Sequence, residues 1–330
     1  MSLRPAILNE LVCPACNGPL SLRQGASGDV LSCTACGKQF PVSPSLVSFT
    51  SDLREQTATA STFGFEWKAF WKGFFDKGDV FGLNFDDTAR YFLSSTGLNR
   101  EDLPGLKILD AGTGSGRIPM SLRGSNSQVY AVDIHDGLHL VADRFKESNG
   151  ACFFRADLFS LPFKDGFFDV AWSSGVIHHT PNPARAFASI ARKVKPGGRI
   201  FVSVYGKDLH HYRLFRKLLP FTRHMPVYIT YLISALLAIP LYVAFNGALL
   251  MIRIKNRNQE PPYRFLGFTV ESIGYKTYRS ILLNLFDQLH PRYQSEHSVD
   301  EVQHWFTSNN LGQTIVVESV GMVGIRGIKK

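Results

Sequence analysis

Five short apolar runs alternate with helical stretches over residues 106–205, and this alternation constrains the fold more than any other feature. Each run has the length and residue types of a buried strand; the runs lie at 106–110, 128–133, 151–156, 167–173 and 199–205. Between the last two, apolar residues from Ala184 to Val194 recur at helical spacing, and Lys-Pro-Gly-Gly at 195–198 ends that helix. Alternating strands and helices predict a parallel, doubly wound α/β sheet that binds its ligand at the carboxyl ends of the strands.

A glycine loop follows the first of these strands. The strand contains Asp110, and Gly112, Gly114 and Gly116 come next, with the spacing G-x-G-x-G rather than the dinucleotide-binding spacing G-x-G-x-x-G. A carboxylate beside this loop repels a diphosphate and favours a cationic ligand. S-adenosylmethionine carries a sulfonium, an ammonium and no phosphate, so we expect this nucleoside here, with glycines letting the backbone approach it closely.

Acidic residues also follow the second and third strands. Asp133 ends the second strand, 21 residues after Gly112, where a carboxylate accepts hydrogen bonds from both ribose hydroxyls. Asp157 follows the third strand, and its carboxylate either accepts from the adenine amino group or caps the next turn.

The ordered segments LDAGTGSGR, VYAVDIH, ADLFSLPF, FDVAWSSGVIHHTPNP and VKPGGRIFVSVY resemble the class I S-adenosylmethionine-dependent methyltransferases, in the branch of the ubiquinone and menaquinone methyltransferases. The resemblance covers residues 105–205 and the end of the chain, where 313–330 would supply the last two, antiparallel strands of a seven-stranded Rossmann-like sheet. It implies these cofactor contacts: the methionine portion at Asp110, Gly112, Thr113, Gly114 and Gly116; ribose and adenine at Asp133 and Ile134; the adenine edge at Asp157 and Leu158; and the sulfonium near Ser173.

Two histidines just past the fourth strand are the candidate catalytic residues. His178 and His179 lie where a general base would reach the methyl acceptor, although either could be a structural histidine bonded to a backbone carbonyl. Tyr205, at the end of the fifth strand, is a weaker candidate, and side chains from 290–298 are a further group that would approach the acceptor. The fourth-strand segment lacks the N-P-P-Y or D-P-P-Y sequence that marks methylation of exocyclic base amines.

Four cysteines near the N-terminus are spaced like zinc ligands. Cys13 and Cys16 form one C-x-x-C pair, and Cys33 and Cys36 form a second. Two such pairs close a tetrahedral four-sulfur site, so we expect a structural Zn²⁺ with no open coordination position; redox-active or incidental pairs are the alternative. Residues 8–50 resemble the Trm112-like zinc ribbon, a module that partners or precedes methyltransferases.

Residues 224–252 form a long apolar run without Asp, Glu, Lys or Arg. Because the strands before and after the run belong to one sheet, we expect no single membrane span, and Pro240 should divide the run into two short helices. Three interpretations remain open: a helical hairpin that dips into one leaflet, a pair of lid helices over an apolar pocket, or an ordinary helical core. Eight Lys or Arg against two acids between 206 and 260 suit an anionic membrane surface.

Aromatic residues crowd the segment 57–71, which contains Phe63, Phe65, Trp67, Phe70 and Trp71. They indicate either an amphipathic helix that packs on the sheet or an N-terminal flap that covers the cofactor.

We therefore expect four parts: a zinc ribbon at 1–50, a helical flap at 51–104, a cofactor-binding domain at 105–205 and 298–330, and a helical lid or membrane-contacting insertion at 206–297. The expected function is methyl transfer to a lipophilic or other small-molecule acceptor, with the inner, cytoplasmic face of a membrane as one expected place for it. The N-terminus has no secretory pattern, so we expect a cytoplasmic, peripheral or monotopic protein. An RNA (guanine) methyltransferase and a non-catalytic partner subunit are the alternatives.

Overall fold

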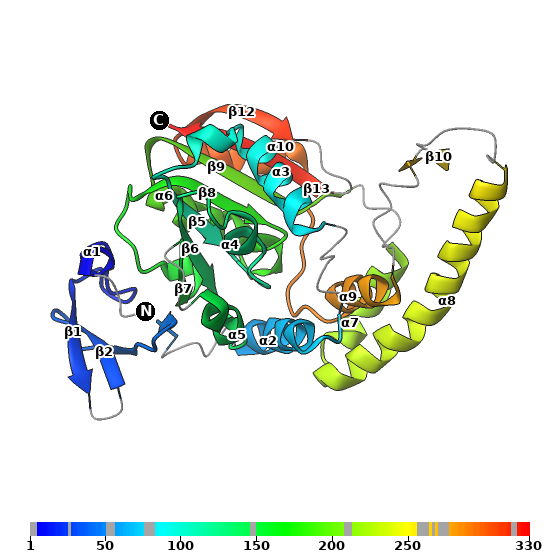
Figure 1. Ribbon diagram of the computed structural model, residues 1–330, viewed down its shortest axis with the longest axis horizontal. Helices are drawn as coiled ribbons and strands as arrows, with labels where there is room; N and C mark the ends of the chain where they lie inside the picture. The colour runs from blue at the N-terminus through cyan, green and yellow to red at the C-terminus, as the bar shows by residue number, and fades with distance from the viewer. Residues whose placement is uncertain are drawn as a thin grey trace.

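An eight-stranded sheet organises the computed structural model of the chain (Figure 1), which describes residues 5–25, 28–50, 57–75, 83–145, 150–207, 213–255, 264–265, 268–269, 277–317 and 322–330. The strand order is β12-β13-β9-β8-β5-β6-β7-β4. The strands are β4 (Leu46–Ser48), β5 (Lys107–Ala111), β6 (Gln128–Asp133), β7 (Ala151–Arg155), β8 (Phe168–Ser174), β9 (Val194–Tyr205), β12 (Leu311–Val317) and β13 (Met322–Lys329).

The sheet has the topology that the sequence predicts, with one addition. Strands β4 to β9 run parallel, whereas β13 pairs antiparallel with β9 and β12 pairs antiparallel with β13. The seven expected strands are present, and β4 is an eighth that pairs with Phe153–Arg155 of β7. The expectation that residues 46–48 belong to a separate ribbon is wrong, because this short strand pairs with β7 and covers what would otherwise be its open edge.

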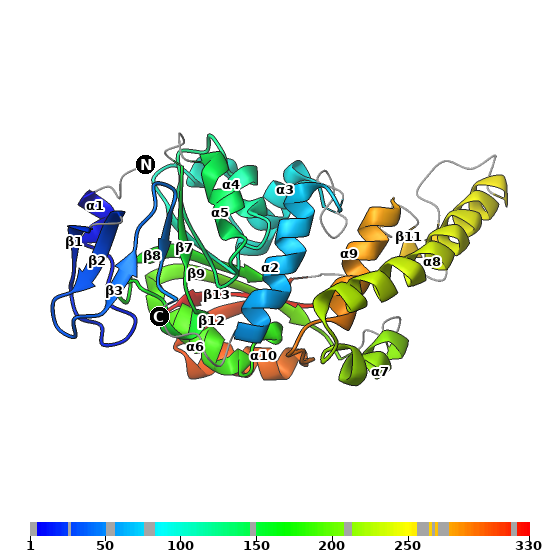
Figure 2. The same ribbon diagram turned by 90° about the horizontal axis from the view of Figure 1, so that it is seen from below.

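Helices cover both faces of the sheet, as Figure 2 shows. On one face lie α3 (Phe85–Thr96), α4 (Arg117–Ser121) and α5 (Leu138–Ala142); on the other lie α6 (Pro183–Lys193) and α10 (Val299–Ser308). Each face has its own core, one built around Phe92, Ile118 and Phe201 and the other around Phe187 and Phe306. Three layers around a mostly parallel sheet make this a doubly wound α/β fold.

The N-terminal part begins with helix α1 (Pro5–Leu8) and forms a small antiparallel sheet of β1 (Leu20–Gly25), β2 (Gly28–Cys33) and β3 (Gln39–Pro41). Its buried residues Leu31 and Phe40 belong to the same apolar core as Phe154 and Phe163 of the large domain. The ribbon is therefore packed onto the main sheet rather than joined to it by a free linker.

A second helical unit begins beside the sheet at α2 and extends to the end of the molecule opposite the N-terminal sheet, where α8 lies (Figure 1). It contains α2 (Thr57–Lys72), α7 (Arg213–Thr222), α8 (Val227–Lys255), α9 (Tyr278–Leu289) and the hairpin of β10 (Arg264–Phe265) and β11 (Phe268–Thr269). Helices α2, α8 and α9 share a core that includes Phe70, Ala238 and Leu282.

The expectation that Pro240 divides the apolar run is wrong, because α8 continues through it as one helix of 29 residues. Proline removes the hydrogen bond to the carbonyl four residues earlier. Pro240 and Leu236 are both exposed, so the carbonyl that loses its partner lies on the solvent side of the helix. At about 1.5 Å per residue, α8 is roughly 43 Å long.

Candidate functional site

The glycine loop brings backbone close to a cleft at the carboxyl ends of β5 and β6. Gly112 and Gly114 have φ values of 88° and 53°, which favour glycine. The amides of Gly112 and Thr113 donate to the Val132 carbonyl oxygen at 2.8 and 3.0 Å, and this ties the loop to the end of β6. A Cβ at Gly114 would lie 2.9 Å from the Trp67 indole, and one at Gly112 would clash with Val176. Neither glycine position therefore has room for a side chain.

Asp133 organises the same cleft from the end of β6. One carboxylate oxygen accepts from the Gly114 amide at 2.8 Å, and the other accepts from the Ile134 amide at 2.8 Å. Its side chain keeps 12% exposure. Each carboxylate oxygen has further lone pairs, so Asp133 retains capacity to accept from a ligand hydroxyl.

The cleft encloses about 580 Å³ including its open mouth, and it is lined by Thr59, Phe63, Trp67, Gly112, Gly114, Asp133, Ile134, Asp157, Leu158, Gly175, Val176, His179 and Thr180. Seven of the cofactor-binding and catalytic candidates from the sequence lie on this list: Gly112, Gly114, Asp133, Ile134, Asp157, Leu158 and His179. Of the aromatic segment, Phe63 and Trp67 line the cleft from α2, while Phe65, Phe70 and Trp71 pack with the helical core. Helix α2 is thus both a flap over the cleft and a core element.

Four residues expected at the ligand also have roles in the fold. The Ser173 hydroxyl donates to the Ala111 carbonyl oxygen at 2.8 Å, which ties β8 to the end of β5. Gly116 begins α4 with a φ of 82°, and the Thr113 side chain is buried. Asp157 lines the cleft while its carboxylate accepts from the Phe159 amide at 2.9 Å, so it caps the turn as the alternative interpretation expected.

Two buried carboxyl groups next to the cleft lack hydrogen-bond partners among the described residues. Both oxygens of Asp110 are in this position, and burial raises the pKa of Asp110 to about 7. Both oxygens of Glu66 also lack partners; this residue lies on α2, between Phe63 and Trp67 in the sequence, and both of these line the cleft. Burial, and then the charges of Asp287 and Asp133, raise the pKa of Glu66 well above the usual range. A cation bound nearby would favour the charged form of both acids, because an opposite charge lowers the pKa of a carboxyl group.

The two candidate histidines have different surroundings. His179 lines the cleft, and its Nδ1 lies 3.1 Å from the Tyr293 carbonyl oxygen. His178 is buried against Tyr205, with ring centroids 4.0 Å apart, and neither ring nitrogen has a hydrogen-bond partner among the described residues. Burial, and then the neighbouring His179, lower the pKa of His178 well below the usual range. His179 is therefore the one positioned to meet a ligand in the cleft.

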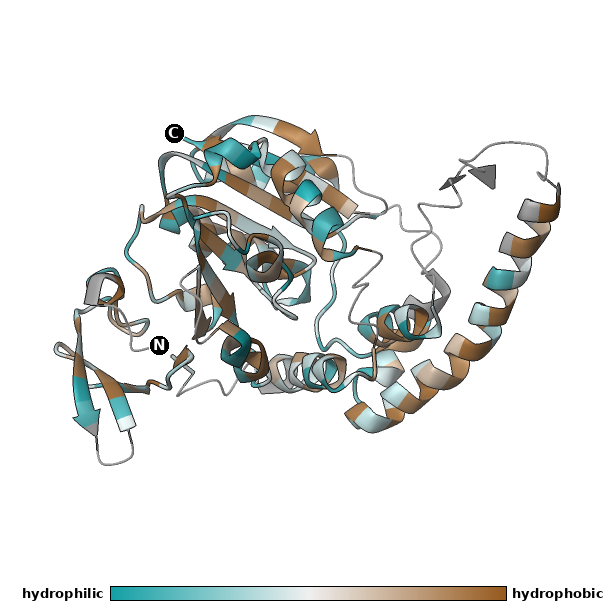
Figure 3. Ribbon diagram, viewed as in Figure 1, coloured by the Kyte–Doolittle hydropathy of each residue, from teal (hydrophilic) through white to brown (hydrophobic). Residues whose placement is uncertain are grey.

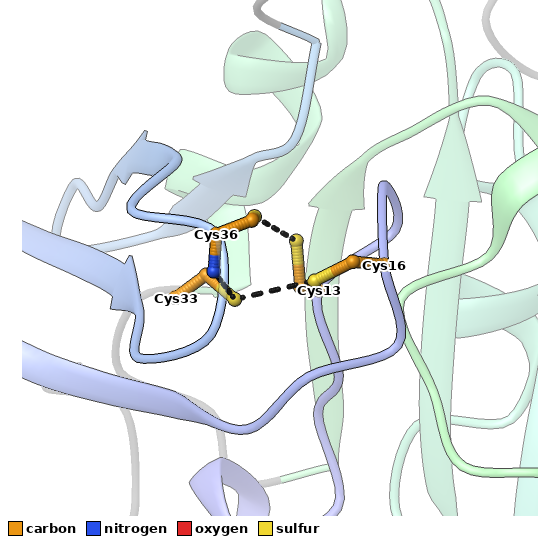
Figure 4. Close-up of side chains that lie close together, drawn as sticks. All are labelled: Cys13, Cys16, Cys33 and Cys36. Carbon is orange, nitrogen blue, oxygen red and sulfur yellow. Dashed lines mark hydrogen bonds between the residues drawn. The ribbon is translucent and has the colours of Figure 1, made fainter.

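The four N-terminal cysteines form a single cluster, drawn in Figure 4. Their sulfur atoms all lie within 4.8 Å of one another; Cys13 and Cys36 are 3.7 Å apart, and Cys16 and Cys33 are 3.5 Å apart. Ligand sulfurs about 2.3 Å from a tetrahedral zinc lie roughly 3.8 Å apart, so the spacing fits such an ion. The Cys36 amide donates to the Cys33 sulfur at 3.4 Å, an interaction that would stabilise a thiolate.

Sequence reasoning missed two buried acids, one beside His179 and one on α2. Asp287 lies in the apolar stretch of α9, and Glu66 lies in the aromatic segment of α2. A single acid in an otherwise apolar buried helix was the available signal for both.

Comparison with known proteins agrees with this geometry. Residues 109–202 match the family model of a methyltransferase domain. A malonyl-[acyl-carrier protein] O-methyltransferase of Erwinia billingiae is 29% identical over 107 residues, which cover 32% of this chain and 42% of that protein. A ubiquinone/menaquinone biosynthesis C-methyltransferase of Shewanella pealeana is 29% identical over 128 residues (37% and 49%), and a ubiquinone biosynthesis O-methyltransferase of Thiobacillus denitrificans is 31% identical over 121 residues (35% and 51%).

The chain spans about half the length of these curated relatives. Among solved structures, magnesium protoporphyrin IX methyltransferase from Synechocystis has a TM-score of 0.48 and 14% identity, covering 83% of this chain and 99% of that one. A complex of the Haloferax volcanii Trm112 activator with its putative methyltransferase has a TM-score of 0.46 and 14% identity, covering 82% and 97%. From the family match, the strand order and the glycine loop together, we conclude that the chain carries a class I S-adenosylmethionine-dependent methyltransferase domain.

Proposed function

We propose that the protein transfers a methyl group from S-adenosylmethionine to a lipophilic small-molecule acceptor at a membrane surface. The observation that carries the methyl-donor part is the pairing of the glycine loop with Asp133, whose carboxylate meets the Gly114 amide inside the cleft. S-adenosylmethionine supplies an electrophilic methyl group on a sulfonium. The chain holds it between the loop and the α2 flap, where Trp67 and Phe63 exclude water.

In this proposal Asp133 and Ile134 hold the ribose and adenine, and Asp157 and Leu158 hold the adenine edge. Asp110 lies beneath the loop that receives the methionine portion, and Gly112, Thr113, Gly114 and Gly116 shape that loop. Ser173 acts indirectly, through its bond to Ala111. His179, on the acceptor side of the cleft, is the general base, and His178 supports it by packing.

The acceptor class is inferred from α8. Over Val227–Gly247 this helix is long and apolar enough to cross a membrane by length and composition, and 17% of the apolar window is buried. Figure 3 shows hydrophobic residues along a helix that projects away from the body of the molecule. Leu232, Leu236, Val243 and Met251 are each more than half exposed. A soluble protein rarely leaves so large an apolar surface uncovered.

A bilayer surface is the occupant that this helix fits best. One side of its N-terminal half packs on α9, where the Tyr278 hydroxyl donates to the Ala235 carbonyl oxygen at 2.9 Å. The rest of the helix is free to lie in the interfacial region of one leaflet, as a monotopic helix does. Exposed Lys217 and Arg223 lie near its start and would attract anionic headgroups. This placement puts a lipophilic acceptor next to α9 and the cleft.

We further propose that Cys13, Cys16, Cys33 and Cys36 hold a structural Zn²⁺. We also propose that the chain is organised as a ribbon that ends before β4 (1–41), a flap (51–104), a cofactor domain (105–205 and 298–330, joined by β4) and an insertion (206–297). The sulfur spacing supports the first part, and the shared core of Leu31 and Phe163 explains how a ribbon would stabilise the domain. With four protein ligands, the ion would take no part in chemistry.

One experiment tests the function as a whole. The purified full chain is incubated with methyl-labelled S-adenosylmethionine, total cell extract and anionic phospholipid vesicles, and the label is partitioned among organic solvent, RNA and protein. We expect solvent-extractable label that requires the enzyme. Label in RNA would overturn the acceptor class in favour of an RNA methyltransferase. Cofactor binding without any transfer would overturn catalysis in favour of a partner subunit.

A further inference from the structure

The hydrogen bond of His179 fixes which of its nitrogens faces the acceptor. The Tyr293 carbonyl oxygen, 3.1 Å from Nδ1, only accepts, so Nδ1 carries the proton in the neutral ring. The Nε2 atom then presents a lone pair. It has no hydrogen-bond partner among the described residues, and the ring lines the cleft. This is the tautomer that a general base requires.

A carboxylate from the helical insertion lies beside that lone pair. Asp287 of α9 places Oδ1 3.8 Å from His179 Nε2. Its other oxygen accepts a 2.5 Å hydrogen bond from the Tyr205 hydroxyl, and the Gln288 amide donates to the same hydroxyl at 2.7 Å. The Tyr205 hydroxyl thus holds Oδ2 of Asp287, while Oδ1 faces His179 Nε2.

The groups that face His179 come from every element packed against it. They are the Phe63 ring from α2, His178 from the same turn, Tyr205 from β9, Asp287 from α9 and the Tyr293 carbonyl. Burial lowers the pKa of His179, and the Asp287 charge opposes that shift. Burial raises the pKa of Glu66 on α2, and the Asp287 charge raises it further, so the neutral form of Glu66 is favoured. Asp287 therefore provides the negative charge closest to the ring.

We propose that Asp287 is a positioning residue that makes His179 a base for an acceptor hydroxyl, so that the enzyme is an O-methyltransferase. This inference rests on the proposed methyl transfer. In the step, Nε2 takes the hydroxyl proton, the acceptor oxygen forms the new O–CH₃ bond, and the C–S bond breaks with its electron pair moving to sulfur. The sulfonium becomes a neutral thioether, and the imidazolium formed is stabilised by Asp287. Tyr205 and Gln288 hold Asp287 in place.

The tautomer and the charge coupling are measured without any acceptor. The full chain, labelled with ¹⁵N-histidine, is titrated by NMR with and without S-adenosylhomocysteine, and His179→Gln identifies the signals. We expect a neutral ring protonated at Nδ1. In Asp287→Asn we expect the proton affinity of His179 to fall by about tenfold, one pKa unit. The exposed Asp300→Asn is the matched control and should leave it unchanged.

A second variant keeps the test informative if Asp287→Asn does not fold. Tyr205→Phe removes a donor from Asp287, concentrates its charge toward the ring and should raise the pKa of His179. If the pKa of His179 is unchanged in both variants, or if the neutral ring is protonated at Nε2, the proposed role of Asp287 is overturned. Calorimetry of S-adenosylhomocysteine binding to the same samples tests the proposed function separately. A chain that does not bind S-adenosylhomocysteine would overturn the proposed methyl transfer, whereas the NMR titration without ligand would still measure the coupling of Asp287 to His179.

The acceptor class has its own readout. Solvent-extracted product labelled from S-adenosylmethionine is heated with hydriodic acid, which cleaves methyl–oxygen bonds and releases methyl iodide. We expect the label to be volatile. Label that stays in the residue would mean methylation at carbon or nitrogen and would overturn the hydroxyl assignment even where transfer itself occurs.

Discussion

The Trp67 indole lies directly against Gly114, at 2.9 Å from the position that a Cβ on this glycine would take. One residue comes from the α2 flap and the other from the loop after β5, so this contact closes the cleft over the proposed methionine site. Any side chain at position 114 would push the flap outward.

Gly114→Ala should therefore weaken S-adenosylmethionine binding by at least about tenfold, which corresponds to about 1.4 kcal/mol. The matched control is Gly124→Ala. Gly124 also has a positive φ, 82°, but a Cβ there meets nothing within 4 Å, so it carries the backbone strain without the clash. Titration calorimetry decides; equal losses in both variants would show that strain, and not contact with the flap, limits binding.

Asp133→Ala should weaken cofactor binding by about 1–3 kcal/mol, the range for a charged hydrogen-bonding group. The carboxylate positions the Gly114 and Ile134 amides as well as the proposed ribose hydroxyls, so both contributions are lost together. Asp86→Ala, an exposed change in the first turn of α3, serves as the control. Unchanged affinity of the Asp133 variant would mean that the ribose site is misassigned.

Glu66→Gln should stabilise the ligand-free protein at neutral pH. The pKa of Glu66 is raised in the folded state, so the folded protein keeps a proton that the unfolded chain loses as pH rises above about 4.5. The free energy of unfolding of the wild type falls through this range, and glutamine has no such dependence. The two Tm values should agree near pH 4 and diverge by pH 7.5 in favour of the variant; a constant difference would refute the assigned shift.

Zinc should stabilise the ribbon and, through it, the sheet. We expect purified protein to contain about one equivalent of zinc, and chelation or Cys33→Ser to lower the Tm, because Leu31 and Phe40 share a core with Phe163. Cys152→Ser is the control, since Cys152 lies on β7 outside the four-sulfur cluster. A metal-free protein with full thermal stability would contradict the zinc proposal.

Membrane association should depend on the exposed side of α8. A Leu232→Asp, Val243→Asp double variant should lose flotation with anionic vesicles and keep its cofactor affinity, because both side chains point away from the α9 interface. Ile315→Asp with Val316→Asp, two exposed apolar residues on β12, is the matched control and should still float. Equal flotation of both double variants would rule out α8 as the contact.

Local patterns in the sequence were sufficient for the central sheet and much of the cleft. Asp133 was identifiable because a strand end, a glycine loop and a 21-residue spacing act within one short segment. The pairing of β4 with β7 was not, because a strand of three residues reveals nothing about a partner strand more than a hundred residues away. Asp287 was missed for the same reason: its contacts with His179 and Tyr205 join three distant segments.

The error at Pro240 has a different origin. A proline in a helical pattern predicts a break, but its cost of about 3 kcal/mol is local. At position 240 the carbonyl that loses its hydrogen-bond partner lies on the exposed side of α8, and the helix continues through the proline. Likewise, no sequence pattern distinguished His178 from His179, since a difference of one residue decides which ring faces the cleft.

The most direct test of the account is a calorimetric titration of the purified chain with S-adenosylmethionine and, separately, with NAD. The carboxylates of Asp110 and Asp133 around the glycine loop should admit the cationic, phosphate-free nucleoside and exclude the diphosphate. We predict stoichiometric binding of S-adenosylmethionine and no detectable binding of NAD. Binding of NAD with no binding of S-adenosylmethionine would contradict the account.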